Sequence, residues 1–124
     1  MMPIHSLVAV VDDDESVRES LPAFLRECGF EVKVFSSAEE FLTSDSLGET
    51  SCLVLDVAMP GMTGPELQYA LRLSGRNIPT IFITGGGDKT VRQALLKQGA
   101  VECLFKPFSD TVLLDALDIA LQGS

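Results

Sequence analysis

The chain has few cysteines, few basic residues and no long apolar runs. Its three cysteines, Cys28, Cys52 and Cys103, are widely spaced and form no CxxC pair, which excludes a disulfide framework and a zinc site. No apolar run approaches the roughly 18 residues of a membrane span. The segment Met1–Ser6 has neither the basic part nor the long apolar part of a signal peptide. We therefore expect three free thiols and a cytoplasmic protein that does not enter membranes.

Basic residues are outnumbered by acidic ones. Nine Lys and Arg residues stand against eighteen Asp and Glu, which gives a formal net charge of −9. Contacts to nucleic-acid phosphates need clustered Lys and Arg, whereas the basic residues here are scattered. The domain itself is therefore not expected to bind DNA. With 124 residues, 46% of them hydrophobic and 22% charged, the chain fits one folded domain over residues 1–124.

Strand-like runs and helical patterns alternate five times along the chain. The runs predict strands at Leu7–Val11, Glu31–Phe35, Cys52–Leu55, Thr80–Ile83 and Val101–Phe105. Helices are predicted at Glu15–Cys28, from a capping box at Ser37–Glu40, at Glu66–Ser74 following a first helical turn at Gly64-Pro65, from a cap at Asp88 to Gly99, and from Ser109 or Asp110 to about Leu121. Pro22 falls inside the first helix, where we expect a kink or a late helix start. Crossovers of this length imply parallel strands with right-handed connections. The predicted fold is an α/β doubly wound (βα)5 sheet of five parallel strands.

Four of these strands end in side chains that can bind a metal ion or a phosphate group. These side chains are Asp12 and Asp13, Asp56, Thr84 and Lys106. Parallel strands place their carboxyl ends on one edge, which is where open α/β sheets bind ligands. Two carboxylates 4 Å apart repel by about 4 kcal/mol at an effective dielectric near 20, and Mg²⁺, which prefers oxygen ligands, would relieve that repulsion. Helix capping is the alternative, and it explains Asp14 and Glu15 better than Asp12 and Asp13.

Asp56 is a candidate nucleophile. It follows an apolar strand and precedes the turn-forming segment Val57–Gly61, so its carboxylate either caps the loop or attacks phosphorus to form an aspartyl phosphate. Thr84 precedes three glycines. It either simply ends a strand, or its hydroxyl donates to a phosphoryl oxygen. Lys106 is either a solvated strand-end lysine or an ammonium group aimed by a cis peptide to Pro107. Together these residues predict a phosphoryl-transfer site.

These motifs, in this order, resemble the receiver domain of two-component response regulators. The motifs are Val11–Asp14, Leu55–Gly64, Ile83–Gly85 and Phe105–Phe108. The chain is most similar to receivers of the FixJ type, through Gly29–Val32, Ser37–Leu42 and Ile83–Asp88. The resemblance covers essentially the whole chain. It implies the receiver fold, which is flavodoxin-like with strand order 2-1-3-4-5.

The resemblance also implies a metal site and a phosphoacceptor. Asp56 would accept a phosphoryl group from a histidine kinase. Asp13, Asp56 and the Ala58 carbonyl would hold Mg²⁺ directly, and Asp12 would help through water. Such a protein is a switch that catalyses only its own phosphorylation and dephosphorylation, rather than an enzyme with a separate substrate.

Thr84 and Lys106 would contact the phosphoryl oxygens and start the response. In the family, the threonine moves inward and the fourth helix, fifth strand and fifth helix rearrange, as a population shift between two states. The same three elements would support a homodimer. The FixJ-type resemblance implies a C-terminal DNA-binding output domain that controls transcription, and we expect that domain to be absent from this chain.

One position departs from the family pattern. Receivers usually carry Tyr or Phe three residues before the lysine, and this chain has Cys103. The signal would then pass through Thr84 and backbone shifts, or through Phe105, although we expect strand alternation to direct that ring differently. Ala58 and Gly86 are small neighbours of Asp56, so we expect access of water to set the lifetime of the phosphate.

Two other functions compete with a phosphorylated receiver. A HAD-type phosphatase would use Asp12-x-Asp14, but it needs another acidic motif at a strand end after the lysine, and the candidates lie in the predicted last helix. These candidates are Asp110, Asp115 and Asp118. The second alternative is a receiver-like interaction module that no longer uses phosphate, for which Cys103 is the argument.

Overall fold

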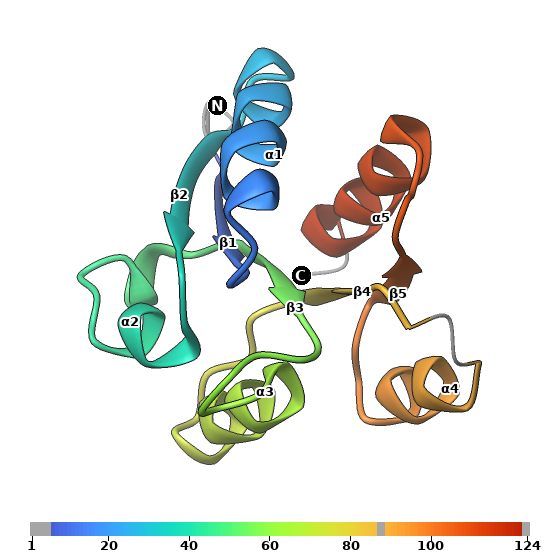
Figure 1. Ribbon diagram of the computed structural model, residues 1–124. Coiled ribbons are helices and arrows are strands. Elements are labelled where there is room, and N and C mark those ends of the chain that lie inside the picture. Colours follow the sequence, from blue (N-terminus) through green and yellow to red (C-terminus); the bar gives the residue numbers. More distant parts are fainter. Residues whose placement is uncertain (1–5, 87–88, 123–124) are drawn as a thin grey trace.

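A computed structural model describes residues 6–86 and 89–122 and contains one parallel β-sheet (Figure 1). Its strands are β1 (Leu7–Val11), β2 (Glu31–Phe35), β3 (Cys52–Asp56), β4 (Thr80–Thr84) and β5 (Glu102–Phe105). The strand order is β2-β1-β3-β4-β5, and each neighbouring pair is parallel. Both the predicted (βα)5 class and the strand order are confirmed.

Helices cover both faces of the sheet. They are α1 (Glu15–Glu27), α2 (Ala38–Leu42), α3 (Gly64–Leu73), α4 (Lys89–Lys97) and α5 (Asp110–Gln122), with a short 3-10 turn, η1, at Leu47–Glu49. α1 and α5 lie on one face, and α2, α3 and α4 lie on the other (Figure 1). This three-layer arrangement leaves the carboxyl ends of the strands uncovered at one edge.

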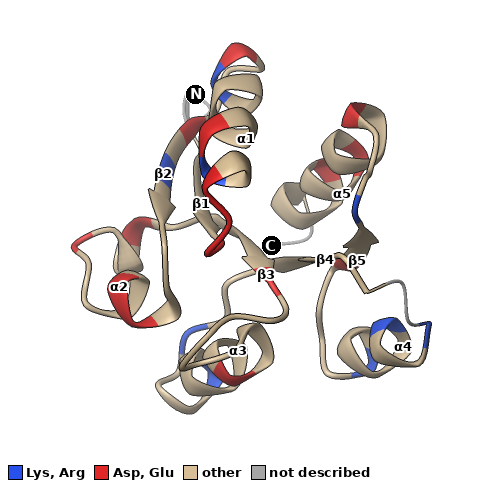
Figure 2. Cartoon of the chain, in the orientation of Figure 1, with Lys and Arg blue, Asp and Glu red and all other residues tan. Residues whose placement is uncertain are grey.

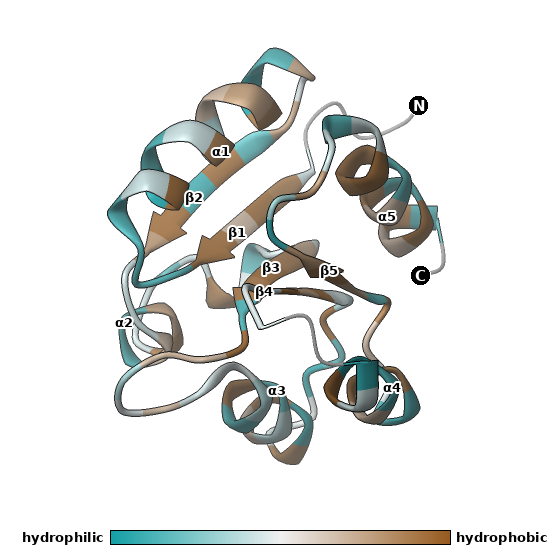
Figure 3. Ribbon diagram, turned by 45° about the vertical axis from the view of Figure 1, so that its right-hand side comes forward, coloured by the Kyte–Doolittle hydropathy of each residue, from teal (hydrophilic) through white to brown (hydrophobic). Residues whose placement is uncertain are grey.

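The alternation of side chains in β1, β3 and β4 divides the core in two. Val8, Val54 and Ile83 face α1 and α5, whereas Leu55 and Phe82 face α2, α3 and α4. Every residue of β1 and β3 is buried, which explains why these strands read as continuous apolar runs. The hydrophobic sides of the helices face the sheet (Figure 3).

The cysteines are free, as predicted. Cys52 and Cys103 are buried and Cys28 is exposed. Burial raises the pKa of the Cys52 and Cys103 thiols, that of Cys52 to about 12. Both thiols therefore behave as small apolar side chains rather than as nucleophiles.

The first helix begins at Glu15 and continues through Pro22, so a late start at the proline is wrong. Asp14 fixes this start, because its Oδ1 accepts hydrogen bonds from the Ser16 amide at 2.9 Å and the Ser16 hydroxyl at 2.8 Å. These bonds lower the pKa of the Asp14 carboxyl. Asp14 is thus the helix cap that the sequence indicated, and its own amide donates to Asp12 Oδ1 at 2.9 Å.

The capping boxes differ from the prediction. Ser37 Oγ accepts from the Glu40 amide at 3.0 Å, but Glu40 Oε1 accepts from the amide of Ser36 at 2.6 Å instead of closing the box at Ser37. A complete box occurs between Thr63 and Glu66, which the sequence did not lead us to expect. It starts α3 at Gly64, with Pro65 in the first turn, as the Gly64-Pro65 pair predicted.

No helix in the described ranges is long and apolar enough to cross a membrane. The predicted helix cap at Asp88 and the last of the three glycines, Gly87, lie outside these ranges, as do residues 1–5 and 123–124.

Candidate functional site

Three carboxylates meet at the carboxyl edge of the sheet. Asp12 and Asp13 follow β1 directly, and Asp56 is the last residue of β3, whose Leu55 pairs with Val11 of β1. One carboxylate oxygen of each aspartate lies within 4.8 Å of the others. Figure 2 shows these acidic ends of β1 and β3 beside each other. Within residues 6–86 and 89–122, no other group of three metal-ligating side chains comes together in this way.

Burial makes this cluster electrostatically unfavourable without a cation. Asp12 is fully buried, Asp56 is 7% exposed and Asp13 is exposed. Burial, and after it the charge of Asp12, raise the pKa of Asp56 to about 7, and the Lys106 ammonium opposes the shift. A hard divalent cation binds carboxylate oxygens, and its charge would offset the cost of burying these carboxylates in their ionised form. The residues present therefore fit a magnesium site.

Lys106 completes the other side of the site. Its Nζ lies 3.3 Å from Asp12 Oδ2, and the lysine side chain is partly buried. The Lys106–Pro107 peptide is cis, as predicted. The Lys106 amide donates to the Thr84 carbonyl at 2.7 Å, so the ends of β4 and β5 remain hydrogen-bonded beyond the strands. The lysine thus contributes the positive charge that three clustered carboxylates need.

Thr84 is the last residue of β4, one residue after Ile83, which pairs with Asp56. Its hydroxyl oxygen accepts a hydrogen bond from the Gly86 amide at 3.2 Å. The structure therefore places Thr84 at the predicted edge, with its hydroxyl bonded to its own loop rather than to the carboxylates.

The loop after Asp56 is closely fitted, which the sequence did not reveal. The Gly64 amide donates to the Val57 carbonyl at 3.0 Å, and a Cβ on Gly64 would overlap the backbone oxygen of Asp56. Met59 is buried and Ala58 is exposed. The Gly64-Pro65 pair predicted a helix start, but only the fold shows that Gly64 must be glycine for Asp56 to lie where it does.

Cys103 lies in the core under α4, with 2% of its surface exposed. Phe105 is two residues further along the same strand and therefore points to the same face, so the expectation that alternation directs it differently is wrong. The Arg92 side chain of α4 donates through Nε to the Cys103 carbonyl at 3.3 Å and forms an ion pair with Glu102. These two polar contacts join α4 to β5 at the position where receivers usually carry an aromatic ring.

The acidic residues after the lysine lie on a helix. Asp110, Asp115 and Asp118 all belong to α5, so the described chain lacks the additional strand-end carboxylate that a HAD-type phosphatase requires. This finding removes the main structural argument for that alternative.

Comparison with known proteins identifies relatives over nearly the whole chain. The chain is 47% identical over 117 residues to nodulation protein W of Bradyrhizobium diazoefficiens, covering 94% of this chain and 52% of that protein. It is 44% identical over 113 residues to the transcriptional regulatory protein FixJ of Rhizobium meliloti, covering 91% and 55%. The chain thus spans about half the length of the curated relatives it matches, and the predicted FixJ-type resemblance is confirmed.

The fold is also that of a solved receiver structure. The response regulator protein TrrA of Thermotoga maritima, in complex with Mg(2+)-BeF, superposes with a TM-score of 0.82 at 28% identity, covering 94% of this chain and 99% of that one. The family model for the response regulator receiver domain matches residues 8–118. Together with the acidic cluster and the strand order, this match shows that the chain belongs to the response regulator receiver domain family.

Proposed function

We propose that Asp56 is the phosphoacceptor of this two-component receiver and that its phosphorylation requires Mg²⁺. The observation that carries the proposal is the position of Asp56, a buried carboxylate flanked by Asp12 and Asp13, with Lys106 beside Asp12. As a receiver, the chain is a switch rather than an enzyme that turns over a separate substrate.

Asp13, Asp56 and the Ala58 carbonyl would hold the ion, with Asp12 assisting through water. Bound Mg²⁺ supplies positive charge that screens the carboxylates from the incoming phosphoryl group and stabilises the transition state. Support comes from the oxygen-only donor set and the raised pKa of Asp56. The relative TrrA, which was solved in complex with Mg(2+)-BeF, also supports the choice of ion.

The residues of the chain then divide the transfer between them. An oxygen of the Asp56 carboxylate attacks phosphorus, forming an O–P bond as the bond from phosphorus to the donor breaks. The donor is a phosphohistidine of the kinase, whose imidazole leaves. Lys106 turns from Asp12 to the new phosphoryl oxygens, and Thr84, whose hydroxyl oxygen accepts from the Gly86 amide, donates its O–H to them.

Acetyl phosphate tests this proposal, with intact mass as the measurement. With Mg²⁺ present, the wild type is expected to gain a single phosphoryl group, and Asp56→Asn is expected to gain none, because it lacks the nucleophilic oxygen. Asp115→Asn, an exposed site on α5, serves as the control and should behave as wild type. No adduct on the wild type would favour the interaction module, and sustained turnover of an added phosphate ester would favour a phosphatase.

The readout of the switch would lie on α4, β5 and α5. We propose that movement of Thr84 is transmitted to the Arg92 contacts on Cys103 and Glu102, in place of an aromatic ring. The same face would form the homodimer, and a DNA-binding output domain elsewhere in the whole protein would act in transcription, in the cytoplasm. The relative FixJ, a transcriptional regulatory protein about twice as long as the matched region, supports this output.

The lifetime of the phosphate should depend on Ala58. Ala58 is exposed two residues after Asp56, and its methyl side chain has no polar atom that could orient water. Ala58→Asn is expected to speed dephosphorylation by roughly 3- to 10-fold, since its amide can hold an attacking water but cannot act as a general base, which is worth about 10²-fold or more. Loss of the phosphorylated mass with time checks this, and equal half-lives would contradict it.

A further inference from the structure

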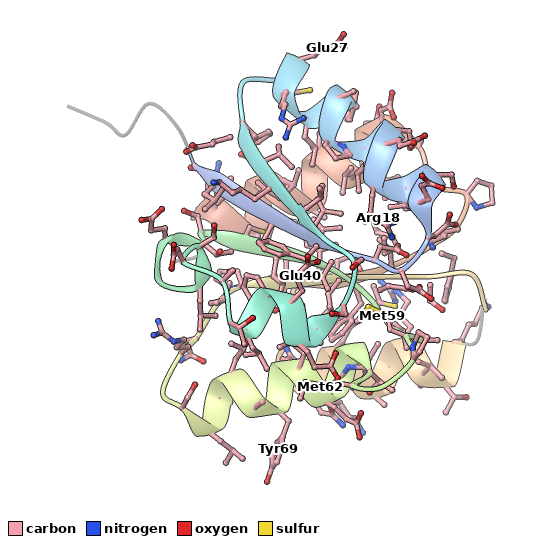
Figure 4. All side chains as sticks on the ribbon, turned by 60° about the vertical axis from the view of Figure 1, so that its left-hand side comes forward. Arg18, Glu27, Glu40, Met59, Met62 and Tyr69 are labelled. Atoms are coloured by element: carbon pink, nitrogen blue, oxygen red, sulfur yellow. The ribbon has the colours of Figure 1, made fainter. Side chains whose placement is uncertain are left out.

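A carboxylate of α2 reaches the loop that follows Asp56. The amide of Met62 donates to Glu39 Oε2 at 3.1 Å, across 23 residues of sequence. The two segments lie beside each other, with Met59 and Met62 in the loop next to α2 (Figure 4). No part of the phosphorylation mechanism described above uses Glu39.

The loop approaches the Glu39 carboxylate closely at Gly61. Gly61 has a φ of +75°, and a Cβ added there would lie 2.9 Å from Glu39 Oε2. Most residues would be strained at that φ, so a residue without a side chain is what allows the loop to approach the carboxylate. Glu39 thus lies against the bend at Gly61 and also accepts a hydrogen bond from the next amide.

The helix that carries Glu39 is firmly held. Ala38 and Phe41 are fully buried in the core beneath α2, and the ring of Phe41 packs edge-on against Phe35 with centroids 5.3 Å apart. Because α2 is held in this way, the Glu39 carboxylate on it can fix the position of the loop at Gly61 and Met62.

Ala58 lies between two anchored stretches of this loop. On one side, the Val57 carbonyl accepts from the Gly64 amide. On the other, Met59 is buried, and Met62 is bonded to Glu39. The orientation of the Ala58 carbonyl, which has no side-chain anchor of its own, therefore depends on how these neighbours are held.

We propose that Glu39 is a positioning residue of the metal site. By holding the loop at Gly61 and Met62, it keeps the Ala58 carbonyl available to an ion bound by Asp13 and Asp56. This inference rests on the proposed function, since it assigns Glu39 a role in binding the Mg²⁺ that phosphorylation would require.

Magnesium affinity of the unphosphorylated chain, measured by calorimetry, tests the role without any turnover. Glu39→Ala is expected to bind Mg²⁺ about 3- to 10-fold more weakly than wild type, as loss of one hydrogen bond that orients a ligand would produce. Phosphorylation by acetyl phosphate should slow at low Mg²⁺ and return to the wild-type rate at saturating Mg²⁺. Glu39→Gln keeps an acceptor oxygen for the Met62 amide and should restore most of the affinity.

Glu40→Ala is the matched control. Glu40 is the next residue on the same helix, is also exposed, and bonds to Ser36 rather than to the loop. Both alanine variants remove one negative charge, so a general electrostatic effect on Mg²⁺ binding would appear equally in both. Equal affinities of the two variants would overturn the proposal for Glu39. If the wild type bound no Mg²⁺, the proposed function itself would fail, and this inference would fail with it.

Discussion

Asp56→Asn is expected to stabilise the metal-free protein by about 2–4 kcal/mol at pH 8. The pKa of the Asp56 carboxyl is raised from its ordinary value of 3.8 to about 7, first by burial and then by the charge of Asp12. At pH 8 the folded protein must therefore hold a charged group that its surroundings disfavour. Asparagine has nearly the same shape and no charge.

The gain should depend on pH in a defined direction. Between about pH 4 and pH 7, the folded protein binds more protons at Asp56 than the unfolded chain does, so the stability of the wild type falls as pH rises through this window. The advantage of the variant should therefore grow from near zero at pH 4 to its full size at pH 8. Urea unfolding at a series of pH values measures it.

Two further measurements separate this cause from a general effect of lost charge. Asp115→Asn makes the same chemical change at an exposed position of α5 and should change stability little at any pH. Added Mg²⁺ should stabilise the wild type more than Asp56→Asn, because a ligand that binds only the folded state raises its stability. A variant less stable than the wild type at pH 8 without metal would show that burial of Asp56 carries no such cost.

Gly64→Ala is expected to destabilise the protein by about 3 kcal/mol. A Cβ at this position would overlap the Asp56 carbonyl oxygen and lie 3.1 Å from Cε1 of Phe82, which is fully buried. Neither neighbour can move easily, because one is backbone at the end of β3 and the other is a core ring. The displaced backbone also belongs to Asp56, the proposed phosphoacceptor, so phosphorylation by acetyl phosphate should slow as well. Urea unfolding and intact mass measure the two effects.

Gly48→Ala provides the comparison for this prediction. Its added Cβ would have one neighbour, the Arg76 side chain at 3.7 Å, which is an ordinary contact. Gly48→Ala should therefore be neutral or slightly stabilising, since alanine reduces the freedom of the unfolded chain. Similar losses of stability in the two variants would contradict a steric role for Gly64.

The sequence predicted the sheet and the position of the site because both depend on local signals. Buried parallel strands read as apolar runs, and each polar strand end marks one edge of the sheet. These polar strand ends, with the strand order that the family resemblance implied, predicted that Asp12, Asp13, Asp56 and Lys106 would come together. The cap at Asp14 was equally local, since its partner is only two residues away.

The errors concern contacts that local patterns do not determine. Pro22 suggested a kink or a late helix start, and the late start is wrong because the Asp14 cap and burial of Leu21 and Leu25 hold α1 from its first turn. The capping box predicted that the Glu40 carboxylate would accept from the Ser37 amide, but it accepts from the Ser36 amide. Glu39 contacts a loop 23 residues away, and nothing in the spacing of either segment predicts this.

The ion pair between Lys106 and Asp12 joins residues 94 positions apart, and β5, which precedes the lysine directly, is the last strand and lies at the edge of the sheet. During synthesis, a chain that has emerged only as far as α4 already contains Asp12, Asp13 and Asp56 but does not yet contain Lys106. Such a nascent chain, or a fragment truncated at that point, cannot form the complete site. Competence to receive a signal would thus be acquired only when translation of the domain is nearly finished.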